Sequence, residues 1–177
     1  MKYYFLAIFI SVVFNTNGQE PDPFFAEKTA LSESRKMLKS ASFTEQSGYA
    51  ETDLIYQLME WNVDPAIKYI SGKITSYFRV KSTSINKISF DLMDNLTVDS
   101  VVQNKTRMNF VHSGDILTIS LKKTLEKGVI DSLSVYYQGI PDASGFGSFV
   151  CATHGNNIPV MWTLSEPYGA REWWPCK

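Results

Sequence analysis

The two histidines are the first side chains in this sequence that could carry chemistry, because imidazole binds metals and transfers protons near neutral pH. His112 and His154 lie far apart, and neither has acidic or cysteine partners at the spacing of a zinc site. The sequence contains no H-E-x-x-H motif. We therefore expect two exposed loop histidines and no metal site in this chain.

Other catalytic motifs are also missing from the sequence. Residues 145–149 contain two glycines but lack the third glycine and the following helix of a phosphate-binding loop, so a turn leading into a strand explains them better. No G-x-S-x-G elbow and no P-loop lysine occur. Acidic pairs such as Asp91 and Asp94 are typical of solvated strand and turn residues. We expect no catalytic residue in this chain.

The segment 162–177 is the most unusual part of the sequence, because large aromatic residues and prolines gather in it. Pro167 restricts the preceding Glu166 to an extended conformation, which suits a carboxylate presented at the end of a strand. Considered alone, Glu166 is typical of a solvated turn acid. Trp173 and Trp174 are interpreted as interface or core anchors, and we expect an isolated chain to expose their surface and to aggregate.

Period-two alternation of apolar residues indicates that strands position this segment. The alternation is clearest at 70–80, 87–92, 115–122 and 131–138. Each of these strands has an apolar or aromatic face that we expect to point inward: Ile70, Ile74, Phe78, Val80, Ile88, Phe90, Leu92, Leu117, Ile119, Leu121, Leu133, Val135 and Tyr137. Weaker patterns predict five further strands, at 54–63, 97–103, 108–111, 147–152 and 159–164.

The spacing of these strands predicts an all-β fold, an antiparallel β-sandwich or saddle of about nine strands. A hairpin through residues 112–115 is the simplest connection between two of them. No helical pattern alternates with the strands, which disfavours a parallel α/β sheet. A weak helical spacing within 21–48 predicts a short marginal helix before the β-domain.

The N-terminal residues have the order of a secretory signal, in which Lys2 precedes an apolar run and a short polar stretch. We predict a signal peptide at 1–18, a leader with a marginal helix and linker at 19–52, and a β-domain at 53–177. The apolar run is shorter than the about 20 residues of a membrane span. We therefore expect an exported protein, periplasmic, cell-surface or extracellular, with no membrane span.

Composition and short motifs limit the remaining partners and modifications. The formal charge of -1 leaves no excess of positive charge for phosphates, so nucleic acid is not an expected partner. Cys151 and Cys176 could pair in an oxidising compartment, but two separate thiols fit the sequence equally well. Asn95 and Asn104 each begin an N-glycosylation sequon.

Residues 166–176 read E-P-Y-G-A-R-E-W-W-P-C. This stretch resembles the E-P-x-x-A-R-x-x-x-P-C signature of the aminopeptidase N family, which are zinc metallopeptidases of the gluzincin type. Weaker similarities to the family's first domain lie at 60–61, 70–72, 115–119 and 133–141. The resemblance covers 53–177.

The resemblance implies an N-terminal β-saddle domain of a zinc aminopeptidase that hydrolyses N-terminal residues from peptides, with the sequence stopping before the catalytic domain. Zinc is then expected in the full-length enzyme, held by a catalytic domain with H-E-x-x-H and G-x-M-E-N motifs that this sequence lacks. Alone, the chain should be inactive. The matching position makes Glu166 a substrate-binding residue that clamps the α-amino group. The other motif residues are expected to be structural, at the domain junction: Pro167, Arg171, Trp173, Trp174, Pro175 and Cys176.

The alternative function belongs to another class, a non-catalytic secreted β-sandwich that binds a protein or a carbohydrate. Exposed aromatic residues near Lys177 would then form its binding patch. The coding sequence downstream of Lys177 distinguishes the two, because only the enzyme requires a zinc-binding domain there.

Overall fold

The described residues form nine antiparallel strands, which confirms the all-β prediction. The structure is a computed structural model, and it describes residues 27, 30–31, 49–141, 148–165 and 169–177. A single turn of 3-10 helix, η1 (Tyr49–Glu51), precedes the strands, and a second, η2 (Ala170–Glu172), follows them. The strands are β1 (Thr52–Asp64), β2 (Ile67–Val80), β3 (Ser84–Asp91), β4 (Leu96–Gln103), β5 (Thr106–Ser113), β6 (Ile116–Glu126), β7 (Ile130–Gly139), β8 (Phe149–His154) and β9 (Ile158–Thr163).

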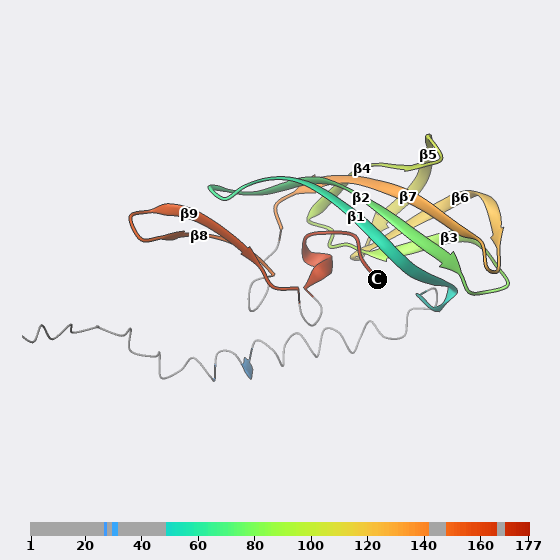
Figure 1. Ribbon diagram of the computed structural model, residues 1–177, viewed down its shortest axis with the longest axis horizontal. Coiled ribbons are helices and arrows are strands. Elements are labelled where there is room, and N and C mark those ends of the chain that lie inside the picture. The colour runs from blue at the N-terminus through green and yellow to red at the C-terminus, as the bar shows by residue number, and fades with distance from the viewer. Residues whose placement is uncertain (1–26, 28–29, 32–48, 142–147, 166–168) are drawn as a thin grey trace, which may run out of the picture.

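The first seven strands make one curled sheet, in the order β1-β2-β7-β4-β5-β6-β3. Strands β8 and β9 pair only with each other among the described residues, and their hairpin projects from one end of the molecule, at the left of Figure 1. The segment with η2 lies beneath the curled sheet (Figure 1). This position places residues 169–177 against the concave side, where the core lies.

The core consists of the apolar faces that the alternation predicts. All thirteen residues expected to point inward are buried and belong to one continuous cluster: Ile70, Ile74, Phe78, Val80, Ile88, Phe90, Leu92, Leu117, Ile119, Leu121, Leu133, Val135 and Tyr137. This cluster contains residues of β2 and β7 together with residues of β3 and β6. The prediction of the inward faces is therefore confirmed.

The β5–β6 hairpin is also confirmed, but its turn is tighter than expected. Strand β5 continues through His112 to Ser113, and the turn falls on Gly114 and Asp115, which both have positive φ angles, 63° and 62°. The prediction that His112 is an exposed loop residue is wrong. Its side chain is 11% exposed, and its Nε2 lies 2.8 Å from the carbonyl oxygen of Leu92. His154 is exposed, at the end of β8.

The predictions for the N-terminal segment fall almost entirely outside the described residues. The signal peptide at 1–18 lies outside them, and so does the leader at 19–52 except for Glu27, Ala30, Leu31 and the residues from 49 onward. Those three isolated residues are helical. Among the described helices, none has the length and apolar character needed to cross a bilayer.

Candidate functional site

The C-terminal segment is fastened to the core by aromatic contacts. The Trp173 side chain lies among three other rings, with centroid separations of 4.8 Å to Trp61, 5.8 Å to Phe149 and 4.3 Å to Trp174. The Trp173–Trp174 pair has the edge-to-face geometry, at 87°, that aromatic quadrupoles favour. Trp173 is 7% exposed, so the residue directly after η2 is part of the core.

A chain of hydrogen bonds fixes the same point of the backbone. The Trp61 indole N–H donates to the Tyr137 hydroxyl at 2.9 Å, and this hydroxyl donates to the Trp173 carbonyl oxygen at 2.6 Å. Burial raises the pKa of the Tyr137 phenol far above its ordinary value of 10.0, although the bond from Trp61 opposes this shift. Tyr137 therefore remains a neutral donor and holds the backbone after η2 in place.

The last residues pair with strands from both ends of the sheet. The backbone N–H groups of Asp91 and Cys176 donate to each other's carbonyl oxygens, at 2.8 and 3.0 Å. The Gln57 amide on β1 donates to the Pro175 carbonyl oxygen at 3.1 Å, and Lys177 Nζ donates to Thr52 Oγ1. Strands β1 and β3 are the two edges of the seven-stranded sheet. The segment therefore connects the two edges across the concave side.

Residues on both sides of 166–168 are held close together. The Gly169 N–H donates to the Ser165 carbonyl oxygen at 2.7 Å, and the Trp173 indole N–H donates to Ser165 Oγ at 3.1 Å. A Cβ atom on Gly169 would lie only 2.7 Å from the Ser148 Cβ atom, so the backbone passes the base of β8 without room for a side chain. Within this base, the buried Ser148 hydroxyl donates to the carboxylate of the buried Glu172.

The structure describes only some of the predicted site residues. Glu166 and Pro167 lie outside the described residues, so the predicted substrate-binding role of Glu166 stays a prediction. Arg171 is half-buried within η2, and its carbonyl oxygen accepts a bond from the Met93 N–H at 3.0 Å. The remaining predicted junction residues, Trp173, Trp174, Pro175 and Cys176, pack within this chain.

The expectation that an isolated chain exposes the Trp173–Trp174 surface is wrong. Trp173 is buried in the core, and Trp174 packs against it and is half-buried. The physical reason is the curl of the sheet, which lets Trp61 on β1 and Phe149 on β8 cover the indoles. Aggregation through an exposed tryptophan pair is therefore not expected.

Glu172 and Ser148 are site residues that the sequence analysis did not identify. Glu172 occupies a variable position of the E-P-x-x-A-R-x-x-x-P-C pattern, and Ser148 comes from another segment. A carboxylate that is 5% exposed requires a donor, and Ser148 supplies one from a fully buried position. No local sequence signal links residues this far apart.

The two cysteines are free thiols. Cys151 Sγ lies 3.9 Å from the Ile67 carbonyl oxygen, while Cys176 is held against Asp91. Burial, together with the nearby Asp91 carboxylate, raises the pKa of the Cys176 thiol from 9.0 to about 12, and Arg171 opposes this shift. Because the thiolate is the reactive form, Cys176 is not a nucleophile near neutral pH.

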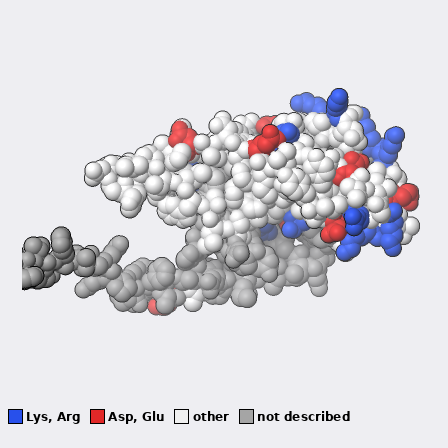
Figure 2. Space-filling view, viewed as in Figure 1, with Lys and Arg blue, Asp and Glu red and all other residues white. Residues whose placement is uncertain are grey.

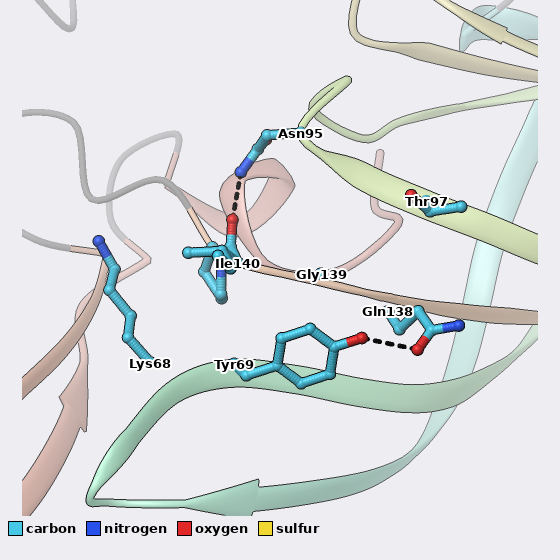
Figure 3. Close-up of a pocket in the computed structure, with 8 residues that line it drawn as sticks. Lys68, Tyr69, Asn95, Thr97, Gln138, Gly139 and Ile140 are labelled. Carbon is cyan, nitrogen blue, oxygen red and sulfur yellow. Dashed lines mark hydrogen bonds between the residues drawn. The ribbon is translucent and has the colours of Figure 1, made fainter.

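No metal centre is found in the part of the chain that the structure describes. No group of three His, Cys, Asp or Glu side chains there could hold a metal ion. An open pocket of about 600 Å³ lies where β2, β4 and β7 meet. Figure 3 shows the Tyr69 hydroxyl bonded to Gln138 at 2.6 Å and the Asn95 amide bonded to the Ile140 carbonyl oxygen at 2.5 Å. Among the described residues that line the pocket, Lys68 is the one that carries a charge.

The solved structures that this chain resembles include M1 zinc metallopeptidases. An M1 zinc metallopeptidase from Deinococcus radiodurans is 25% identical over 75% of this chain, with a TM-score of 0.62. A two-domain M1 zinc metallopeptidase bound to L-arginine is 24% identical over 73% of this chain, also with a TM-score of 0.62. The described fold is that of an M1 N-terminal domain. Yeast LTA4 hydrolase in complex with bestatin shares this fold at 14% identity over 75% of the chain, with a TM-score of 0.60.

The M1 N-terminal domain is a minor part of those enzymes. This chain spans 30% of the length of the Deinococcus radiodurans and two-domain chains and 23% of the yeast chain. No family model matches the sequence, and no curated protein matches it. The similarity that identifies the M1 N-terminal fold is therefore carried by three-dimensional structure together with the motif at 166–176.

Proposed function

We propose that this chain is the N-terminal, substrate-clamping domain of an exported zinc aminopeptidase that hydrolyses N-terminal residues from peptides. The observation that carries the proposal is the coincidence of two independent similarities. The fold matches M1 zinc metallopeptidases over about three quarters of the chain, and the E-P-x-x-A-R-x-x-x-P-C motif occupies 166–176.

Glu166 is the residue that we assign to substrate binding. A peptide's free α-amino group is a charged ammonium, and a carboxylate in a water-poor cleft accepts a charge-assisted hydrogen bond from it. An internal peptide amide cannot satisfy that carboxylate, so the contact selects chain ends. The described flanking residues support this role, since Ser165 and Gly169 are both fixed to the domain.

The aromatic and hydrogen-bond network then acts as the support for the clamp. Trp173 bonds Ser165 on one side of 166–168, and Tyr137 bonds the Trp173 backbone on the other. Fixed flanking residues of this kind would limit the entropy that a binding segment loses when substrate binds. In this proposal the chain contributes binding and orientation, and no catalytic residue of its own.

Zinc belongs to the proposed full-length enzyme and not to this domain. The described residues offer no ligand set, and the sequence has no H-E-x-x-H motif. A zinc ion in the other domain would polarise the scissile carbonyl and activate water. Export is proposed from the N-terminal order of Lys2, apolar run and small polar residues.

The direct test is the coding sequence downstream of Lys177, followed by an assay of the protein that it encodes. We expect G-x-M-E-N and H-E-x-x-H motifs in one frame with this chain, and zinc-dependent release of N-terminal residues from unblocked peptides. A longer protein without those motifs, or one that is inactive with zinc present, would contradict the proposal.

A further inference from the structure

The β8–β9 hairpin has one mostly apolar face, on which four of six residues are exposed. Cross-strand pairing places Val150 opposite Trp162, Ala152 opposite Val160 and His154 opposite Ile158. Since side chains alternate between the faces of a strand, these six residues share one side, which we call the outer hairpin face. Ile158 is 61% exposed and Trp162 is 48% exposed.

The opposite face of the hairpin packs on the core of the domain. Phe149, Cys151 and Met161 lie on that side, where Phe149 is buried and the other two contact the core cluster. The hairpin is therefore anchored in a fixed orientation. Its outer face is apolar without serving the domain's own core.

The hairpin is also unusual in charge and in pairing. Residues 148–165 contain no Asp, Glu, Lys or Arg. In Figure 2 the projecting end of the molecule is nearly free of red and blue atoms, whereas Lys and Arg side chains gather at the other end. Both outer edges of the two-stranded sheet lack a neighbouring strand among the described residues. Natural proteins usually protect such edges with charge or by covering them.

We infer that the outer hairpin face is a docking surface for the second domain of the same polypeptide. The inference rests on the proposed function and specifies how the two domains meet. This chain spans only 30% of the length of a related two-domain M1 enzyme, so most of such a protein lies outside it. Strand β9 leads directly to Ser165, which borders the Glu166 segment. Docking at this face would bring the clamp next to the partner domain, and an uncharged apolar face suits a permanent interface.

The expected contact with the second domain therefore lies at the hairpin and not at Trp173 and Trp174. Trp173 is buried by its own domain, so it offers little apolar area to a partner. Ile158 and Trp162 offer exposed apolar area at a projecting position instead. Residues 169–177 then stabilise the inside of the domain, and the hairpin contacts the rest of the enzyme.

Hydrogen exchange in the longer protein tests the inference. Amides of β8 and β9 should exchange at least tenfold more slowly in the full-length protein than in the 177-residue chain. The double variant Ile158→Lys/Trp162→Lys should remove this protection and accelerate proteolytic separation of the domains. The control Val111→Lys/Tyr56→Lys changes residues that are 66% and 56% exposed on other strands, and should leave both properties unchanged.

The possible results separate this inference from the proposed function. An active enzyme whose hairpin exchanges equally fast in both proteins overturns the docking surface alone. A second domain that protects the hairpin but lacks a zinc motif supports the docking surface and overturns the proposed function. Concentration-dependent protection in the 177-residue chain, with a dimer in sedimentation, would assign the face to a second copy and overturn the inference.

Discussion

The adjacent residues Trp173 and Trp174 differ in whether the indole N–H has a hydrogen-bond partner. The Trp173 indole N–H donates to Ser165 Oγ, whereas the buried Trp174 indole N–H has no partner among the described residues. A buried donor without an acceptor costs about 1–3 kcal/mol, while a satisfied one adds about 0.5–1.5 kcal/mol to stability. The two indoles therefore contribute differently to stability, although they touch each other.

Phenylalanine substitutions should reveal this difference. Trp173→Phe removes the bond to Ser165 and leaves that hydroxyl without its donor, so we expect a greater loss of stability, about 1–3 kcal/mol more than for Trp174→Phe. Both variants lose the same side-chain volume, which makes each the control for the other. Urea unfolding measures the two free energies, and a larger loss for Trp174→Phe would contradict the hydrogen-bond assignment.

The buried Cys176 thiol predicts a dependence of stability on alkaline pH. Its pKa is raised from 9.0 in the unfolded chain to about 12 in the folded protein by burial and by Asp91. The native state therefore holds the proton more tightly, and its advantage is complete below pH 9.0 and falls as pH rises toward 12.

We expect the free energy of unfolding to fall between pH 9 and 10 with a slope of up to ~1.4 kcal/mol per pH unit from this group. Cys176→Ala should flatten the slope, and Cys151→Ala is the matched control that should retain it. Denaturant titrations at fixed pH values provide the measurement. Equal slopes in all three proteins would show that the thiol is not buried as described.

At the scale of elements, the β1–β2 hairpin depends on a close approach at Gly72. A Cβ atom there would lie 2.6 Å from Trp61 Cδ1 and 3.0 Å from the Glu60 carbonyl oxygen. Trp61 in turn bonds Tyr137 and covers both C-terminal tryptophans. The absence of a side chain at Gly72 thus allows β1 to cover the C-terminal segment.

Gly72→Ala should destabilise the domain by about 1–3 kcal/mol, because overpacking displaces the Trp61 ring and weakens its bond to Tyr137. Ser71→Ala on the opposite face of the same strand should change stability by less than about 0.5 kcal/mol. Unfolding monitored by tryptophan fluorescence checks both values. A neutral Gly72→Ala would mean that Trp61 can move without loss of the network.

Most strands could be predicted from the sequence because alternation is a local property. The spacing alone predicts that Ile74, Phe78 and Val135 point inward, and all three are buried. The order of strands is not local, since β7 lies between β2 and β4. The burial of Trp173 depends on that order, because Tyr137 on β7 and Trp61 on β1 meet only in the folded sheet.

The prediction of the candidate site rests on a motif that resembles a family signature, and not on the alternation of apolar residues along strands. The motif points to residues 166–176, but it does not indicate which aromatic residues face inward. Glu172 and Ser148 have no signal in the sequence, since their contact joins the start of β8 to η2. The role of Glu166 remains a prediction, because that residue lies outside the described residues.

At the scale of the whole molecule, the segment that stabilises the sheet from within is separate from the hairpin that projects outward. The C-terminal segment connects both sheet edges from within, while the uncharged hairpin projects at one end. We propose that residues 169–177 stabilise the inside of the domain and that the hairpin contacts the rest of a larger enzyme. The limited share of the M1 chains that it spans agrees with this division.

The central claim is tested most directly by kinetics of the full-length protein with Glu166→Ala, using an aminoacyl substrate with a free α-amino group. Loss of a charge-assisted contact should raise KM and weaken transition-state binding by about 1–3 kcal/mol, which lowers kcat/KM roughly 5- to 150-fold. The exposed Glu126→Ala on β6 is the control and should leave kcat/KM unchanged. An unchanged kcat/KM for Glu166→Ala would contradict the claim that this domain clamps the substrate's amino group.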